Sequence, residues 1–162
     1  MEYFILDEDE RLENKLKINF SDNKFEEDTP FILNLKTEKY TQFQDYMLGK
    51  NIFNYYFCIS EKLYKIFSAY DDFKIVPFFI TDIENKIQMP YFKIEIRTID
   101  CILDENVNKI EDIVICKEKI NDKYIFKIKF KTIERIVVSL HLAENILKAL
   151  PYGIKLVPLK LK

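Results

Sequence analysis

The chain has 162 residues, of which 48% are hydrophobic and 32% are charged, and its formal net charge at pH 7 is −2. A chain of this length buries about 70% of its unfolded surface, which is enough for a core without a disulfide or a metal. The composition excludes a disordered polymer, and no apolar run approaches the roughly 18 residues that a membrane span requires. The first residues also lack a secretion signal. We therefore expect one cytoplasmic domain over residues 1–162 that does not enter a membrane.

The charges are distributed unevenly along the chain. Residues 1–30 contain ten acidic and four basic side chains, a net charge of −6. Residues 115–162 contain four acidic and eleven basic side chains, a net charge of +7. Such an asymmetry can steer a charged partner, or the two ends can neutralise each other in the fold. Of these two interpretations we favour the second.

The first third of the chain predicts little regular structure. Residues 3–6 form an apolar run typical of a short strand, and the polar, acidic segment 7–28 predicts loops around a strand at residues 17–20. A helix is expected over residues 38–48, with Thr37 as its N-cap and Gly49 at its C-terminal end. The apolar positions of its buried face would be Tyr40, Phe43 and Met47.

The next elements form a strand, a helix and a strand. Residues 56–59 are a continuous apolar run, and Ser60 then caps a helix. Its apolar stripe consists of Leu63, Ile66, Phe67 and Tyr70. Residues 73–78 return as a strand. Because Pro77 has no N–H to donate, we expect that strand to end there or to lie at a sheet edge.

Later strands alternate between apolar and polar residues. Residues 92–98 and 126–131 have a period of two, and residues 113–115 supply a further strand. Strands with one solvated face favour an antiparallel or mixed sheet over a doubly wound parallel one. The predicted fold class is therefore α+β, a mixed or antiparallel sheet with helices packed on it.

An internal repeat is the clearest signal in the sequence. Residues 56–78 and 135–159 share a pattern of strand, serine, helix and strand, with Ser60 matching Ser139 and Pro77 matching Pro158. The serines are interpreted as helix N-caps that accept a hydrogen bond from an otherwise unpaired N–H group. A nucleophilic serine is the alternative, but neither copy has the small-residue turn that exposes one.

Residues for enzymatic chemistry are scarce. His141 is the one histidine, and we expect it to be a partly exposed residue in a first helical turn. Gly49 and Gly153 are too far apart for a phosphate-binding loop, and the three cysteines have no CxxC spacing. Reduced, buried thiols are the expectation for Cys58, Cys101 and Cys116. We predict neither catalysis nor any metal or cofactor.

Two charged groups invite a functional interpretation. Asp100, Asp104 and Glu105 are close together after a predicted strand, and a solvated loop is their ordinary explanation. Lys127, Lys129 and Lys131 alternate with apolar residues, as on some nucleic-acid surfaces. Bases stack on rings that lie beside the positive charges, whereas these rings point to the opposite face. We therefore predict a solvated strand face and no nucleic-acid partner.

The repeat units and the segment between them resemble the immunity proteins of bacterial polymorphic toxin systems, in particular the immunity protein eleven family. The resemblance covers about residues 53–162. It rests on the segments Phe57–Leu63, Lys74–Pro77, Ile99-Asp100 with Asp104, Arg135–Ser139 and Gly153–Pro158. The glycine of the second unit has no counterpart in the first, where Asp72-Phe73 stands instead.

This resemblance implies a non-catalytic protein that binds and neutralises a cognate toxin in the cytoplasm. Many such toxins are nucleases with basic clefts, which a carboxylate-rich surface can block. The expected partner-binding residues are Asp7, Glu8, Asp9, Glu10, Asp100, Asp104 and Glu105, with Glu26, Glu27 and Asp28 beside them. Two alternatives remain: a protein-binding or regulatory module without a toxin, and an enzyme with an unfamiliar carboxylate site.

Overall fold

The computed structural model describes residues 1–162 and has the predicted α+β fold. Its first half contains β1 (Tyr3–Glu8), a 3-10 helix (Asn23–Glu26), β2 (Phe31–Asn34), β3 (Tyr46–Lys50), β4 (Tyr55–Ser60), α1 (Glu61–Phe67), β5 (Lys74–Asp82) and β6 (Ile87–Glu95). Its second half contains a 3-10 helix (Ile110–Asp112), β7 (Val114–Ile115), α2 (Lys117–Ile120), β8 (Ile125–Phe130), β9 (Ile133–Ser139), α3 (Leu140–Lys148), β10 (Ile154–Pro158) and β11 (Lys160–Leu161).

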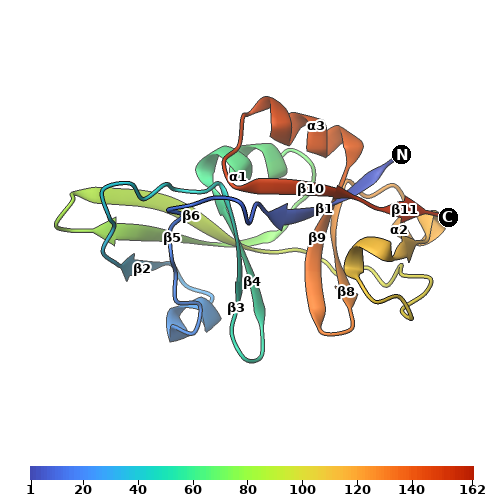
Figure 1. Cartoon of the computed structure of the whole chain (residues 1–162), viewed down its shortest axis with the longest axis horizontal. Helices are drawn as coiled ribbons and strands as arrows, with labels where there is room; N and C mark the ends of the chain where they lie inside the picture. The colour runs from blue at the N-terminus through green and yellow to red at the C-terminus, as the bar shows by residue number, and fades with distance from the viewer.

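The strands form two main sheets that lie beside each other (Figure 1). One sheet has the order β2-β5-β6-β4-β3 and the other the order β10-β1-β9-β8, while β11 and β7 form a separate pair. All pairings are antiparallel except β2 with β5 and β11 with β7. In Figure 1, α1 and α3 lie together above the sheets, and the β3–β4 and β8–β9 hairpins extend downward. The expected mixed sheet with packed helices is confirmed.

The two repeat units have the predicted secondary structure, β4-α1-β5 and β9-α3-β10. In the first, β4 and β5 both pair antiparallel with β6, which lies between them. In the second, β9 and β10 both pair antiparallel with β1. Each unit therefore consists of two parallel strands joined by a helix, with a third strand inserted between them. In the first unit the third strand is β6, which directly follows the unit in the sequence. In the second unit the third strand is β1, which lies near the start of the chain, far before the unit.

The repeat also includes the hairpin before each helix, which the sequence pattern did not reveal. Tyr46 pairs with Ile59 in the β3–β4 hairpin, and Ile125 pairs with Val138 in the β8–β9 hairpin. Both members of the second pair lie 79 residues after their counterparts. The two units thus share one strand register from the hairpin to the helix.

The serines cap their helices as predicted. Ser60 Oγ accepts a hydrogen bond from the Leu63 N–H at 3.4 Å, and Ser139 Oγ accepts one from the Leu142 N–H at 3.3 Å. His141 is exposed in the first turn of α3, also as predicted. Its Nδ1 lies 2.9 Å from the Tyr70 hydroxyl, beside the end of α1.

The central core is shared by both units. Buried side chains of both sheets meet those of α1 and α3 in one cluster, which includes Leu6, Ile59, Leu63, Ile94, Ile136 and Ile146. Two further clusters lie on the opposite faces of the sheets, around Phe25 and Phe78 in one case and around Ile113 and Phe126 in the other. Each sheet therefore has buried clusters on both faces, although outer positions such as Ile32, Phe79 and Lys129 stay exposed.

The helix predicted over residues 38–48 is absent, and the prediction is wrong. Residues 46–50 instead form β3, and Tyr40 is exposed. Thr37 does not cap a helix, because its N–H and hydroxyl both donate to Asp82 Oδ2, at 2.7 and 2.6 Å. Gly49 is a strand residue on which the ring of Phe20 packs so closely that a Cβ would lie 2.2 Å from the ring.

Three other expectations need correction. Residues 17–20 form no strand. The strand containing Pro77 does not end there but continues to Asp82. Pro77 nevertheless has an edge-like position, because β2 pairs only with residues 78–81 of β5. The predicted strand 92–98 is divided: β6 ends at Glu95, and Thr98 bridges to Lys127 of the other sheet.

Candidate partner-binding surface

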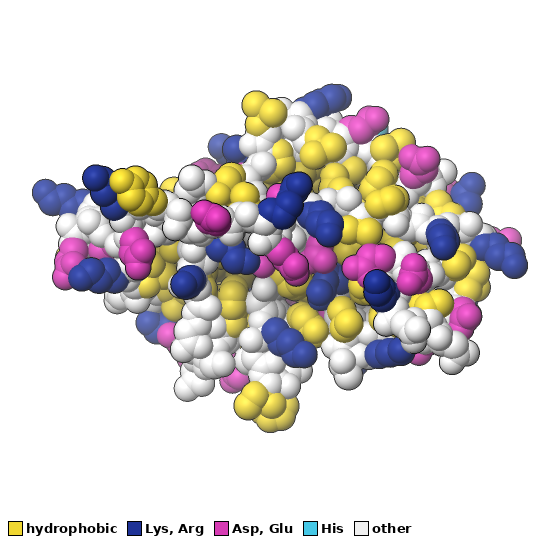
Figure 2. Space-filling view, viewed as in Figure 1, with side chains coloured by type: hydrophobic (Ala, Val, Ile, Leu, Met, Phe, Trp, Pro, Cys, Tyr) yellow, Lys and Arg dark blue, Asp and Glu magenta, His cyan; other side chains and the backbone are white.

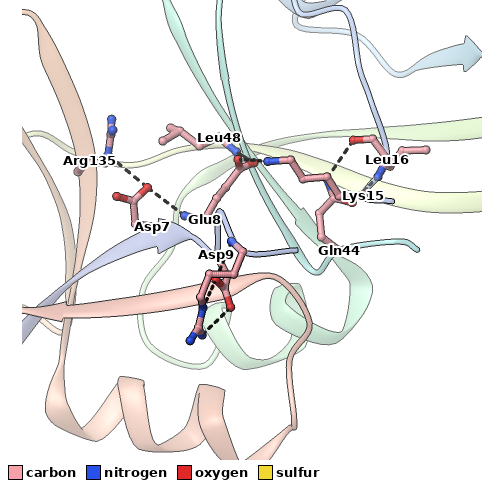
Figure 3. A network of polar contacts seen from close by, with 9 residues as sticks. Asp7, Glu8, Asp9, Lys15, Leu16, Gln44, Leu48 and Arg135 are labelled. Carbon is pink, nitrogen blue, oxygen red and sulfur yellow. Dashed lines mark hydrogen bonds and ion pairs between the residues drawn. The ribbon is translucent and has the colours of Figure 1, made fainter. Parts of the chain in front are cut away.

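The acidic residues at the end of β1 are engaged within the molecule (Figure 3). Glu8 accepts the Leu48 N–H at 2.8 Å with Oε1 and lies 3.3 Å from Lys15 with Oε2. Asp9 binds the Arg11 guanidinium through both oxygens, which lowers the pKa of Asp9 to about 2. Glu8 and Asp9, two carboxylates of the expected binding surface, are therefore paired with basic side chains of the same chain.

The remaining acids of the N-terminal segment differ in their surroundings. Asp7 lies 3.6 Å from Arg135 Nε and stands opposite Lys155 in the β1–β10 register. Asp28 lies 2.8 Å from Lys74. Glu10 is exposed and has no ion pair. Because β1 lies between β9 and β10, the end of this acidic segment contacts the basic C-terminal one, and Asp7 pairs with Arg135. The other paired acids, Glu8, Asp9 and Asp28, have partners outside the C-terminal segment, so the two segments neutralise each other only in part.

Asp100, Asp104 and Glu105 are exposed on the loop between β6 and β7, and none of them forms an ion pair. The loop is held on β8, since the Ile99 N–H donates to the Lys127 carbonyl at 2.9 Å. Asp104 Oδ1 accepts the Asn106 N–H at 2.8 Å, which fixes the turn that carries it. Leu103, in the middle of the group, is 47% exposed. The three carboxylates and the half-exposed Leu103 therefore lie on one anchored loop.

The loop acids share a hollow with two lysines. Asp100, Glu105, Lys129 and Lys131 line a hollow of about 390 Å³. Lys127 belongs elsewhere, because it forms a 2.9 Å ion pair with Glu134. The alternating side chains Phe126, Ile128 and Phe130 are buried on the opposite face of β8, as predicted. The structure thus brings the acidic loop and the lysine face together, which the sequence pattern had treated as separate surfaces.

A polar groove of about 260 Å³ lies where the two sheets meet, bounded by both hairpins. Lys74, Lys93 and Lys127 line it, together with Asp28, Glu95 and Glu134. Lys93 Nζ donates to the carbonyls of Phe25 and Glu27 at 2.6 and 2.8 Å, and burial lowers the pKa of Lys93. The charges of the groove are therefore balanced by neighbours from several elements.

The tip of the β3–β4 hairpin carries two highly exposed apolar side chains. Ile52 and Phe53 are 87% and 85% exposed. A group of hydrophobic side chains lies at the lower end of the molecule in Figure 2, where Figure 1 shows the end of the β3–β4 hairpin. The sequence analysis did not predict this turn at residues 51–54. The available signal was an apolar pair between two asparagines, a residue type that favours turns.

No cluster of three or more His, Cys, Asp or Glu side chains is arranged to hold a metal ion. No helix is long and apolar enough to cross a membrane. The cysteines are free, with Cys58 and Cys101 buried and Cys116 partly exposed. Burial raises the pKa of the Cys101 thiol to about 11.

Comparison of the sequence with protein-family models and with curated proteins gives no match.

Proposed function

We propose that this chain is a non-catalytic immunity protein that binds and neutralises a cognate bacterial toxin in the cytoplasm. The observation that supports this proposal is the anchored loop that exposes Asp100, Asp104 and Glu105 together with the half-exposed Leu103. Protein interfaces typically combine apolar side chains with polar and charged ones. Carboxylates without internal ion pairs are free to steer a basic partner such as a nuclease.

A specific observation favours a second candidate. Lys129 and Lys131 line the same hollow as Asp100 and Glu105, so this surface has mixed charge. A mixed surface also suits a partner that is not strongly basic. The second candidate is therefore a protein-binding or regulatory module that acts without a toxin.

Co-expression with the product of the adjacent open reading frame tests the proposal. If that product is a toxin, it should stop growth when expressed alone, and this chain should restore growth. The two purified proteins should then form a complex. A growth defect that this chain does not relieve, or an adjacent product that is harmless, would refute the proposal and favour the second candidate.

A further inference from the structure

We propose that the tip of the β3–β4 hairpin anchors the chain to a protein partner by inserting Ile52 and Phe53 into an apolar pocket. This inference deepens the proposed function by naming the element and the chemistry of the contact. It rests on that function only in taking the partner to be a protein. Large apolar side chains at the centre of an interface contribute most of its binding energy.

The turn that carries these side chains is held in one conformation by Asn51. Asn51 Oδ1 accepts the N–H groups of Phe53 and Asn54 at 2.9 and 2.7 Å, and its Nδ2 donates to the Tyr56 hydroxyl at 3.1 Å. The Asn51 N–H also donates to the Asn54 carbonyl at 3.0 Å. A tip fixed in this way loses little conformational entropy when it binds, so more of the contact energy appears as affinity.

The repeat shows that the fold does not require apolar residues at this tip. In the β8–β9 hairpin, the residues at the positions of Ile52 and Phe53 are Lys131 and Thr132, and both are exposed. The neighbouring Phe130 is 1% exposed and packs in the core under its sheet. The chain thus contains two hairpins of equal length, one with a polar tip and one with an apolar tip.

The surroundings of the tip favour a protein pocket over a lipid surface or a second copy. Binding to a lipid surface depends on apolar area and on an excess of basic residues. Residues 50–54 contain one lysine, and the three lysines of the adjacent groove are balanced by three acidic side chains. A stable dimer needs a total interface of about 1,000 Å² or more, and a contact between two tips alone would supply too little area. The polar groove beside the tip, which Asn54 and Tyr55 help to line, can form the hydrated rim around such a contact.

Site-specific cross-linking identifies the partner without assuming its nature. A photoreactive phenylalanine analogue is placed at position 53 of the full chain, or at position 132 as the matched control, in the cells that produce the protein. We expect one protein to be cross-linked from position 53 and not from position 132. No cross-linked protein, or equal cross-linking from both positions, would overturn the proposal.

The cross-linked protein is then purified, and its dissociation constant is measured with the wild-type chain and with the double variant Ile52→Lys, Phe53→Thr. This variant copies the tip of the other hairpin and should keep the wild-type melting temperature. We expect affinity to fall by at least about 30-fold. The single variant Phe53→Ala provides the same test if the double variant melts early. An unchanged affinity in the correctly folded variant would overturn the proposal.

A lipid surface or a second copy of the chain, as the binding partner of the tip, would give different results in these experiments. Binding of the wild-type chain, but not of the variant, to vesicles of phosphatidylglycerol and phosphatidylethanolamine would overturn the proposal in favour of a lipid surface. Self-association that the variant abolishes would overturn it in favour of a second copy. If the adjacent gene product is harmless but position 53 binds a protein, only the toxin assignment fails. If the variant restores growth as well as the wild-type chain, only the hairpin assignment fails.

Discussion

Tyr3 and Tyr91 occupy equivalent positions in the two repeat units. Tyr3 lies on the middle strand β1 and pairs with Ser139. Tyr91 lies on the middle strand β6 and pairs with Ser60. The Tyr3 hydroxyl donates to the Lys123 carbonyl at 3.0 Å, and the Tyr91 hydroxyl donates to the Gln44 carbonyl at 2.9 Å. Lys123 and Gln44 are themselves equivalent, 79 residues apart. Each tyrosine thus ties its middle strand to the segment before its hairpin.

Replacing either tyrosine with phenylalanine should destabilise the protein by similar amounts. The change Tyr3→Phe or Tyr91→Phe keeps the buried ring but leaves a carbonyl without its donor, at a cost of about 1 kcal/mol each. Chemical denaturation measures the free energy of unfolding. Tyr40→Phe, at an exposed position, is the control and should have no effect. A large loss in only one of the two variants would contradict the equivalence.

The two capping serines should differ in their contribution to stability. Ser139→Ala removes one cap bond and should cost about 1 kcal/mol. Ser60→Ala also removes the 2.6 Å bond from Ser60 Oγ to Asp45 Oδ1, and a bond to a carboxylate raises the expected cost to about 2 kcal/mol. Thermal melts of both variants provide the comparison. Equal losses would mean that the bond to Asp45 contributes no net stability.

The extent of the repeat shows what the sequence could and could not predict. The units were visible because Ser60 and Ser139 must both cap helices, which fixes the residue type. The hairpins were not visible, since a strand accepts many residues at one position. The relation of β1 to β6 was hidden by the chain order. The dipeptides Tyr3-Phe4 and Tyr91-Phe92 were its only trace.

The incorrect helix has a different cause. Apolar residues at Tyr40, Phe43 and Met47 fit a helical face, but the backbone of this segment is used in long-range contacts. The Asp45 N–H donates to the Tyr152 carbonyl at 2.8 Å, and the Thr37 N–H donates to Asp82 Oδ2 at 2.7 Å. Such partners are remote in the sequence, so a local pattern cannot reveal them. The acidic site was also predicted from local sequence alone. Its one pair that local sequence could have revealed is Asp9 with Arg11, because only one residue separates them.

Asp82 should make stability depend on pH in the acidic range. Hydrogen bonds from Thr37 and Asn85 hold the pKa of Asp82 below its usual value. A lowered folded-state pKa stabilises the protein fully above the unfolded-state pKa of about 3.9, and this stabilisation is lost as pH falls towards the folded-state pKa. Asp82→Asn should therefore lower the melting temperature at pH 7, and its difference from the wild type should shrink at pH 3.

The exposed neighbour Glu84 provides the control for that experiment. Its ion pair with Lys36 is 3.4 Å long and solvated on both sides, so Glu84→Gln should change the melting temperature little at either pH. A difference between Asp82→Asn and the wild type that is as large at pH 3 as at pH 7 would show that Asp82 stabilises the turn through its shape and not through its charge.

Charge reversal on the β6–β7 loop should weaken binding to a basic toxin. The triple variant Asp100→Lys, Asp104→Lys, Glu105→Lys should associate more slowly with the toxin, and the association rate of the wild type should fall as salt rises, because the Debye length is about 10 Å at 0.1 M. Lys129→Glu with Lys131→Glu, on the same hollow, is the matched control. It should preserve or increase affinity. The opposite ranking of dissociation constants would indicate an acidic partner.

The position of β1 has a consequence for how the molecule assembles during synthesis. All strands of the first unit lie within residues 46–95, so this unit can close while later residues are still being added. The second sheet is different, because β1 leaves the ribosome long before its two neighbours β9 and β10. Contacts between segments so distant in the chain form slowly. Until they form, β1 exposes apolar residues and two unpaired edges, which favours aggregation of the growing chain.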